Sequence, residues 1–230
     1  MSELFSIQLQ NRQQQGRDGV WLDLPTTTEQ VQAALRQIGI SSDNPQGLFI
    51  SGYFAEEEKR FAIPYNMVLA SNVDELNFLA ARLETLSAGE RAELNAALQA
   101  PQSDLSSIGR ITDFPENVDY YVHLPDVHGP AQLGDYYLNR SGMVNMPEEW
   151  KGGIDTAQFG RYVAQQEQGT FTQYGYLVKS GDKWQKVYEG QPVPEEYRVL
   201  SFPVPEVMRD AANIPPPVQP ETEPQKVIPI

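Results

Sequence analysis

Two histidines and an aspartate form the clearest grouping of metal-ligand residue types in the sequence. His123, Asp126 and His128 lie within six residues. Imidazole nitrogens and carboxylate oxygens are ligands of zinc and of non-haem iron. However, Pro125 and Gly129 deny this stretch a helical register that would bring the three side chains together, and a catalytic site would need a further ligand. We therefore expect a loop here and no bound metal.

Other groupings of residues in the sequence give no stronger indication of a catalytic site. Glu148 and Glu149 are adjacent, so they point to different sides and do not form the separated acid and base of a glycosidase. Gly152-Gly153 lacks the lysine and hydroxyl of a phosphate-binding loop, and no serine stands in a nucleophile-elbow setting. The chain has no cysteine, which removes thiolate nucleophiles, disulfides and thiolate metal sites. We expect no cofactor and no enzyme activity.

Carboxylates are concentrated in one part of the chain. Residues 74–135 carry eleven acids against three arginines, a net charge of −8 within a total of −14. The acids are Asp74, Glu75, Glu84, Glu90, Glu93, Asp104, Asp113, Glu116, Asp119, Asp126 and Asp135. A negative field repels nucleic acid and attracts basic, DNA-binding proteins. We predict that these acids form a partner-binding surface; the alternative is a solvated face that only maintains solubility.

Length and composition favour a globular chain. With 230 residues, 40% hydrophobic and 10% aromatic, the sequence can bury packed cores. No run approaches the roughly 18 to 20 apolar residues of a membrane span. The first residues lack the basic start and apolar block of a signal peptide. We expect a cytoplasmic protein with no membrane partner.

The elements that would hold the acidic surface begin with a small sheet. Strand patterns cover residues 4–9, 20–24 and 47–54. Thr26 and Glu29 have the spacing of a capping box in front of a helical pattern that ends at Gly39. These elements predict an N-terminal α/β domain over residues 1–65.

The apolar period becomes helical between residues 71 and 111. Ser87 and Glu90 form a second capping-box pattern, and Pro101 ends the helix that comes after it. The acids fall mostly on the side away from the apolar stripe, so we expect them to project outward. This pattern predicts a helical, acidic middle domain over residues 66–115.

The last folded segment is again mixed, and it predicts a C-terminal α+β domain over residues 116–202. The expected elements are a strand at 120–124, helices at 132–138 and 155–165, a hairpin running from 169–178 through a turn at 180–182 to 184–188, and an edge strand at 198–202. The second helix is expected to bury Phe159, Tyr162 and Val163. Residues 203–230 are rich in proline and are expected to form an extended tail without a core.

Tyrosine is frequent in the C-terminal segment and fits either a core or a subunit interface, because it combines a large apolar area with a polar tip. The residues concerned are Tyr120, Tyr121, Tyr136, Tyr137, Tyr174 and Tyr176. Tyr136 and Tyr137 are the candidate dimer contacts.

Several blocks resemble the ArdA antirestriction proteins of conjugative plasmids and transposons. The blocks are Trp21-Leu22-Asp23-Leu24-Pro25, Ile38-Gly39-Ile40, Asn72-Val73-Asp74-Glu75-Leu76-Asn77, Leu133-Gly134-Asp135-Tyr136-Tyr137, Phe159-Gly160-Arg161 and Phe171-Thr172-Gln173-Tyr174-Gly175-Tyr176. The resemblance covers roughly residues 18–178.

This resemblance implies an α+β fold made of an elongated chain of three small domains. It also implies a homodimer, formed through the last domain, whose curved body looks like bent B-form DNA and occupies the DNA groove of Type I restriction-modification enzymes. The charge is thinner than is usual in the family, and the proline-rich tail is additional. The alternative is a mobile-element interaction module of the same fold that binds another basic DNA-binding protein.

Overall fold

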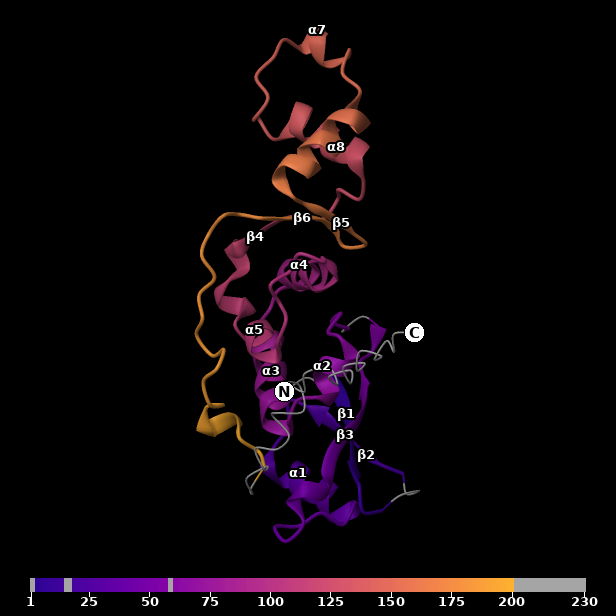
Figure 1. Cartoon of the computed structure of the whole chain (residues 1–230), viewed down its shortest axis with the longest axis vertical. Helices are drawn as coiled ribbons and strands as arrows, with labels where there is room; N and C mark the ends of the chain where they lie inside the picture. Colours follow the sequence, from indigo (N-terminus) through magenta and orange to yellow (C-terminus); the bar gives the residue numbers. More distant parts are fainter. Residues whose placement is uncertain (1–2, 15–17, 58–59, 201–230) are drawn as a thin grey trace, which may run out of the picture.

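The computed structural model describes residues 3–14, 18–57 and 60–200. These form an elongated α+β body, with an N-terminal sheet at one end, helices in the middle and a second small sheet with helices at the other end (Figure 1). The predicted fold class of mixed helices and small sheets is confirmed. Within these residues, no helix is long and apolar enough to cross a membrane.

The N-terminal sheet is antiparallel, with the strand order β2-β1-β3. Its strands are β1 (Phe5–Asn11), β2 (Val20–Leu24) and β3 (Leu48–Phe54). Alternate residues of β1 are buried, as expected for a sheet with one face on a core. The three predicted strands are therefore confirmed.

Helix α1 (Thr28–Gln37) comes after β2, but its capping box lies one residue later than predicted. Thr27, not Thr26, is the N-cap, and its Oγ1 accepts from the backbone N–H of Gln30 while the Gln30 side chain accepts from the Thr27 N–H. Glutamine serves as well as glutamate in this role. The predicted C-terminal glycine is confirmed, because Gly39 has a φ of 67°, which favours glycine.

The middle of the body is helical, as predicted. It contains α2 (Tyr65–Leu69), α3 (Val73–Glu84), α4 (Ala88–Gln99) and α5 (Ile108–Thr112). The capping box of α4 is formed by Ser87 and Glu90, as the spacing indicates. The apolar pattern did not predict α2, since this helix is one short turn whose N-cap, Pro64, has no side-chain donor or acceptor.

The C-terminal part has an antiparallel sheet in the order β4-β6-β5, with helices packed beyond it. After the short 3₁₀ helices η3 (Phe114–Glu116) and η4 (Val118–Tyr120), its elements are β4 (Tyr121–Leu124), α6 (Pro130–Asp135), a π-helix (Tyr136–Arg140), α7 (Glu148–Lys151), α8 (Thr156–Glu167), β5 (Thr170–Thr172) and β6 (Gly175–Lys179).

Three details of this region differ from the prediction. The hairpin is β5–β6, within residues 170–179, and residues 184–188 form no strand; the predicted edge strand is also absent at 198–200, while 201–202 lie outside the described residues. Tyr162 is 60% exposed and not buried. Phe159 and Val163 are only partly buried, and the buried residue of α8 is Gly160.

Helices α6 and α8 are in backbone contact through two glycines. A Cβ atom at Gly134 would come 1.9 Å from Thr156 O, and one at Gly160 would come 1.8 Å from Pro130 O. Both distances are far below any tolerable contact, so only glycine allows this crossing.

Residues 180–200, which we call the strap, leave β6 and return along one side of the body toward α1 (Figure 1). Except for a 3₁₀ turn at Glu195–Tyr197 (η6), the strap has no regular structure. This extended return was not anticipated by the sequence analysis.

The predicted domain boundaries stay predictions. One core extends without interruption from the N-terminal sheet through the middle helices to Val199, and a second, smaller cluster surrounds Leu133 and Tyr176 at the far end. The predicted tail at 203–230 lies outside the described residues.

Replacing Gly160 by alanine should destabilise the protein by on the order of 2 kcal/mol, because α6 and α8 must move apart to admit a methyl group. Urea unfolding measures this loss. Gly152→Ala is the control, since no atom lies within 4 Å of the added Cβ. Equal stability of the two variants would contradict the close helix crossing.

Candidate acidic interaction surface

Only some of the eleven predicted acids face solvent fully. Glu116, Asp119 and Asp126 are exposed, and they lie around η3, η4 and the loop after β4. Glu75 and Glu84 on α3 are half-buried. These five residues are the part of the array that is best placed to meet a partner, although Glu116 also pairs with Arg82.

Three further acids keep their charge but have partners within the chain. Glu90 accepts from the Ser87 N–H at 2.7 Å, and the bonds with Ser87 lower the pKa of Glu90. Asp104 accepts from Lys179 Nζ at 2.9 Å and from the Tyr120 hydroxyl at 2.7 Å, and these contacts lower the pKa of Asp104.

Asp135 is the third acid of this kind. It accepts from Asn139 Nδ2 at 2.8 Å and from Arg140 Nη2 at 2.7 Å, and both bonds lower its pKa. Such pairs reduce the net field that each carboxylate presents, because an adjacent cation or donor offsets it.

Glu93 on α4 differs from all the others. Burial, followed by repulsion from Asp119 and Glu90, raises the pKa of Glu93 to about 8. Its Oε1 is buried without a hydrogen-bond partner among the described residues. Glu93 is therefore mostly protonated at neutral pH and adds little charge to the surface.

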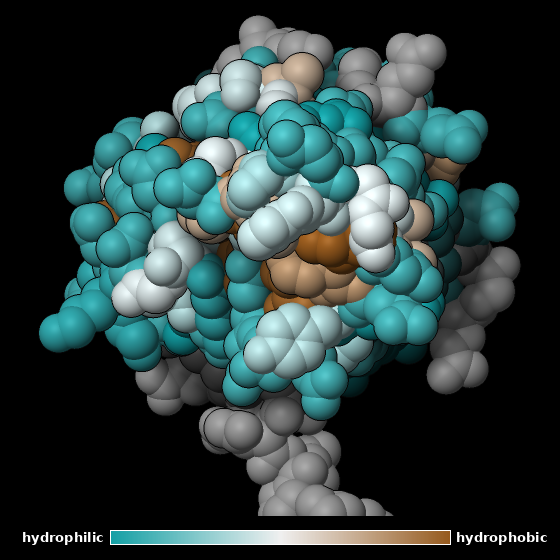
Figure 2. Space-filling model, turned by 90° about the horizontal axis from the view of Figure 1, so that it is seen from above, coloured by the Kyte–Doolittle hydropathy of each residue, from teal (hydrophilic) through white to brown (hydrophobic). Residues whose placement is uncertain are grey.

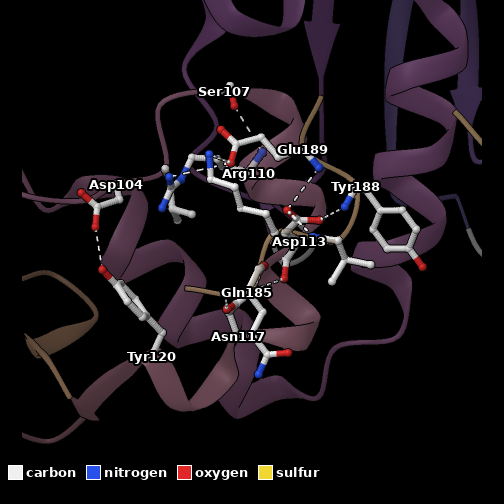
Figure 3. A network of polar contacts seen from close by, with 12 residues as sticks. Asp104, Ser107, Arg110, Asp113, Asn117, Tyr120, Gln185, Tyr188 and Glu189 are labelled. Carbon is white, nitrogen blue, oxygen red and sulfur yellow. Dashed lines mark hydrogen bonds and ion pairs between the residues drawn. The ribbon is translucent and has the colours of Figure 1, made fainter. Parts of the chain in front are cut away.

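Asp113 does not face outward as predicted; its side chain is completely buried. It comes directly after α5 and points at the strap, where its carboxylate accepts three backbone N–H groups: Val187 at 3.2 Å, Tyr188 at 2.6 Å and Glu189 at 3.2 Å (Figure 3). The prediction of a solvent-facing role is wrong for this residue, because a helical pattern does not show that a distant segment covers it.

Asp74 at the start of α3 also holds the strap. Its Oδ1 accepts from the N–H groups of Val199 at 2.7 Å and Leu200 at 2.9 Å. Burial raises the pKa of Asp74, and the two backbone bonds oppose this shift. This carboxylate is engaged mainly within the molecule.

The candidate metal residues do not converge. His123 Nε2 lies 2.7 Å from the Tyr174 carbonyl oxygen, while Asp126 and His128 are exposed on the loop after β4. In the part of the chain that the structure describes, no three histidine, aspartate or glutamate side chains are grouped so that they could hold a metal ion.

The two candidate dimer contacts lie in the small C-terminal core cluster. The Tyr137 hydroxyl donates to Glu167, which also accepts from the Tyr176 hydroxyl at 3.0 Å. The Tyr136 ring packs edge to face on Tyr137, with the ring centroids 5.5 Å apart. Both side chains are partly buried, and their role in a dimer stays a prediction.

The predicted surface does not include the exposed acids outside residues 74–135. They are Glu3, Asp18, Asp23, Glu29, Asp43, Glu56, Glu57, Glu148, Glu149, Asp155, Asp182, Glu195 and Glu196. These acids lie at both ends of the body, but in the C-terminal part of the chain they are balanced by exposed bases. The bases are Arg140, Arg161, Lys179, Lys183, Lys186 and Arg198. The positions of the acids in strands, in loops and at helix starts, where polar residues point outward, indicate from the sequence that they are exposed.

Fold and surface together define an elongated α+β protein that carries acidic side chains along its whole length. The sequence model of a family described as "Antirestriction protein (ArdA)" matches residues 15–178, which is more than half of the chain. The chain belongs to the ArdA antirestriction family. A comparison with curated proteins gave no match.

The protonation of Glu93 gives a prediction for stability. Between pH 4.5 and about 8 the folded state holds a proton on Glu93 that the unfolded state has lost. The contribution of Glu93 to the free energy of unfolding therefore falls as pH rises through that range. The Glu93→Gln variant should therefore be more stable than the unchanged protein by on the order of 1 kcal/mol at pH 8.5, and the two should be almost equally stable at pH 4.5.

Chemical unfolding at the two pH values measures this difference. Asp126→Asn is the control, because it removes a carboxylate from an exposed position. A gain from Glu93→Gln that is the same at both pH values would show that the buried proton is not its cause.

Proposed function

We propose that this chain is an acidic DNA mimic that inhibits Type I restriction-modification enzymes by occupying their DNA-binding groove. Membership of the antirestriction family supports the general role. The observation that carries the finer proposal is the distribution of exposed acids along an elongated body. An elongated body with negatively charged side chains on its surface resembles a length of duplex DNA.

Electrostatics explains how such a body competes with DNA. Duplex DNA carries about one charge per 1.7 Å of its axis, and a protein that binds it releases condensed counterions. Carboxylates on a folded body can occupy the same basic groove without the ordering cost of a flexible chain. Since each exposed carboxylate contributes little, binding is distributed over many residues and weakens with salt.

We further propose that the protein acts by binding and not by catalysis, in the cytoplasm, where it meets restriction enzymes. The use of its polar side chains supports this view. Asp74 and Asp113 accept backbone N–H groups, Asp104 and Asp135 have basic partners, and Glu90 caps a helix. None of these arrangements places an acid and a base on either side of a pocket.

A homodimer joined through the C-terminal end belongs to the same proposal. Seen from that end, the surface has a hydrophobic area surrounded by hydrophilic residues (Figure 2). The segments at this end include Met143, Trp150 and Tyr162, which are 75%, 68% and 60% exposed. Exposed apolar groups of this size are typical of contact surfaces, and two copies joined there would double the length of the acidic body.

A second candidate is binding to a different basic DNA-binding protein. It is favoured by the smaller number of carboxylates that face outward, since Asp74 and Asp113 hold the strap and Glu93 is protonated. The surface is therefore less negative than the sequence suggests. A partner with a smaller basic surface than a restriction enzyme would fit such a field.

A competition experiment separates these candidates. A labelled duplex bound to a Type I modification enzyme is titrated with the protein at two salt concentrations. Displacement that weakens at high salt supports groove occupancy. If the duplex stays bound at both concentrations, the mimic proposal fails and the second candidate stands.

Charge reversal at the exposed acids should weaken displacement. We expect Asp119→Lys and Asp126→Lys each to raise the protein concentration needed for displacement of the duplex by roughly two- to fivefold, because each places a cation against a basic groove. Asp119→Glu, which keeps a carboxylate at the same exposed site, is the matched control. Equal effects of Asp119→Glu and Asp119→Lys would show that the charge at this site plays no part in displacement.

The proposed dimer predicts that Trp150→Ser weakens self-association by at least about tenfold, because a large apolar side chain is lost from the contact. Sedimentation equilibrium measures this change. Trp21→Ser removes a tryptophan that is 50% exposed on the N-terminal sheet, so it should leave association unchanged. A monomeric parent protein would contradict the dimer outright.

A further inference from the structure

The strap is attached to all three regions of the body, beginning at the C-terminal sheet. Ser180 donates to the Tyr120 carbonyl oxygen from its N–H at 3.0 Å and from its hydroxyl at 3.1 Å. Just before it, Lys179 pairs with Asp104 at 2.9 Å. These bonds fix the point at which the chain leaves β6.

Along the middle helices the strap is held chiefly by its backbone. Asn117 donates to the Gln185 carbonyl oxygen at 3.0 Å and accepts from the Gln185 N–H at 2.7 Å. Asp113 accepts the next group of N–H donors, as described above (Figure 3). The Trp184 ring packs on Tyr120, with the centroids 5.1 Å apart, and the Arg110 guanidinium lies 4.8 Å from the Trp184 ring centroid.

At its far end the strap reaches the N-terminal sheet through one side chain. Asn77 on α3 is buried, accepts from the Thr26 N–H at 2.7 Å and donates to the Tyr197 carbonyl oxygen at 3.0 Å. It thereby joins the strap to the β2–α1 connection. Val199 beyond it is part of the main core.

Polar bonds carry much of this attachment, because packing around the strap is incomplete. A cavity of about 810 Å³ lies between strap residues 188–193 and helices α2 and α5, with Ser107, Thr112 and Phe78 among its lining. Phe78 contacts the rings of Tyr188 and Tyr197 at centroid distances of 4.9 and 4.8 Å. The backbone bonds to Asp113 lie beside this cavity and hold the strap where packing does not.

The chain enters the C-terminal sheet from η4, and two of the contacts that join this sheet and its helices to the rest of the body lie apart from each other. One is the contact of α4 with β4 and β6. The other is the strap, which runs along the side of the body away from α4 (Figure 1). A single contact allows rocking about that contact, whereas a second one at a distance from it opposes rotation.

We propose that residues 180–200 are a tie that fixes the orientation of the C-terminal part relative to the rest of the body, with Asp113 and Asn77 as its positioning residues. The matched family region ends at residue 178, so the tie is an addition to it. This inference rests on the proposed function in one respect: a fixed orientation sets the spacing between acids at the two ends, and hence the fit to a rigid groove.

Spin labels can test the tie directly, because the chain has no cysteine of its own. Labels at Ser42→Cys and Gln166→Cys, both exposed, report the distance between the N-terminal and C-terminal ends of the body. Asp113→Asn should broaden the distance distribution. It should also speed hydrogen exchange at Val187, Tyr188 and Glu189 by roughly 10- to 100-fold, because the charged acceptor is lost.

Two further proteins complete the experiment. Glu196→Gln removes the same charge from an exposed site on the strap and should leave the distribution unchanged. A protease site inserted after Gly181, where no atom lies within 4 Å of an added Cβ, allows the strap to be cut from β6 in the folded protein. The cut protein should also show a broader distribution, and it decides the matter if Asp113→Asn does not fold.

Unchanged widths in both the Asp113→Asn and the cut protein would overturn the tie. In the duplex competition, both proteins should be several-fold weaker; stronger competition would overturn the proposal in favour of a strap that masks the acidic surface. The spin-label result needs no restriction enzyme. Failure of the unchanged protein to displace DNA therefore counts against the proposed function and not against the tie.

Discussion

The arrangement of the molecule depends on how one buried carboxylate is satisfied. Asp113 has no exposed surface, and an isolated carboxylate in such a place would be strongly unfavourable. Three consecutive backbone N–H groups from residues 187–189 resolve this by donating to it. The same bonds give an acceptor to backbone N–H groups that would otherwise have none, because the extended segment has no strand partner. The carboxylate and the strap therefore need each other, and the path of the strap from β6 to α3 results from that mutual requirement.

Whether each of the other acids holds the structure or faces solvent depends more on its surroundings in the fold than on its position in the sequence. Glu90 completes a capping box, Asp104 and Asp135 have basic partners, and Glu93 holds a proton because water does not reach it well. Asp119 and Asp126 remain open to solvent. An inhibitor that uses negative charge must keep some carboxylates solvated while it uses others to hold its shape. In this chain both uses occur within the same stretch of 62 residues, from Asp74 to Asp135.

Local patterns predicted the elements that are stabilised locally. The alternation in β1, the capping box at Ser87 and the glycine after α1 each act over a few residues, so they can be recognised without knowing the fold. The strap could not be found in this way. Its stability comes from partners 60 to 126 residues away, such as Tyr120 for Ser180 and Asp74 for Leu200. The same distance explains the error at Asp113, whose burial depends on a segment with no periodic pattern. The family blocks include Gly134 and Gly160, but the reason for these glycines, the backbone contact between α6 and α8, is seen only in the structure.

The strap itself is almost neutral, with four acids and three bases among residues 180–200. It nevertheless removes carboxylates from the surface, because it engages Asp113, which is fully buried, and Asp74. Two chains with the same family region and equal formal charge can thus offer a partner different numbers of carboxylates, according to the segment that comes after β6. The number of acids counted from sequence is an upper limit on the carboxylates that such a protein can present, and a neutral extension is enough to lower it.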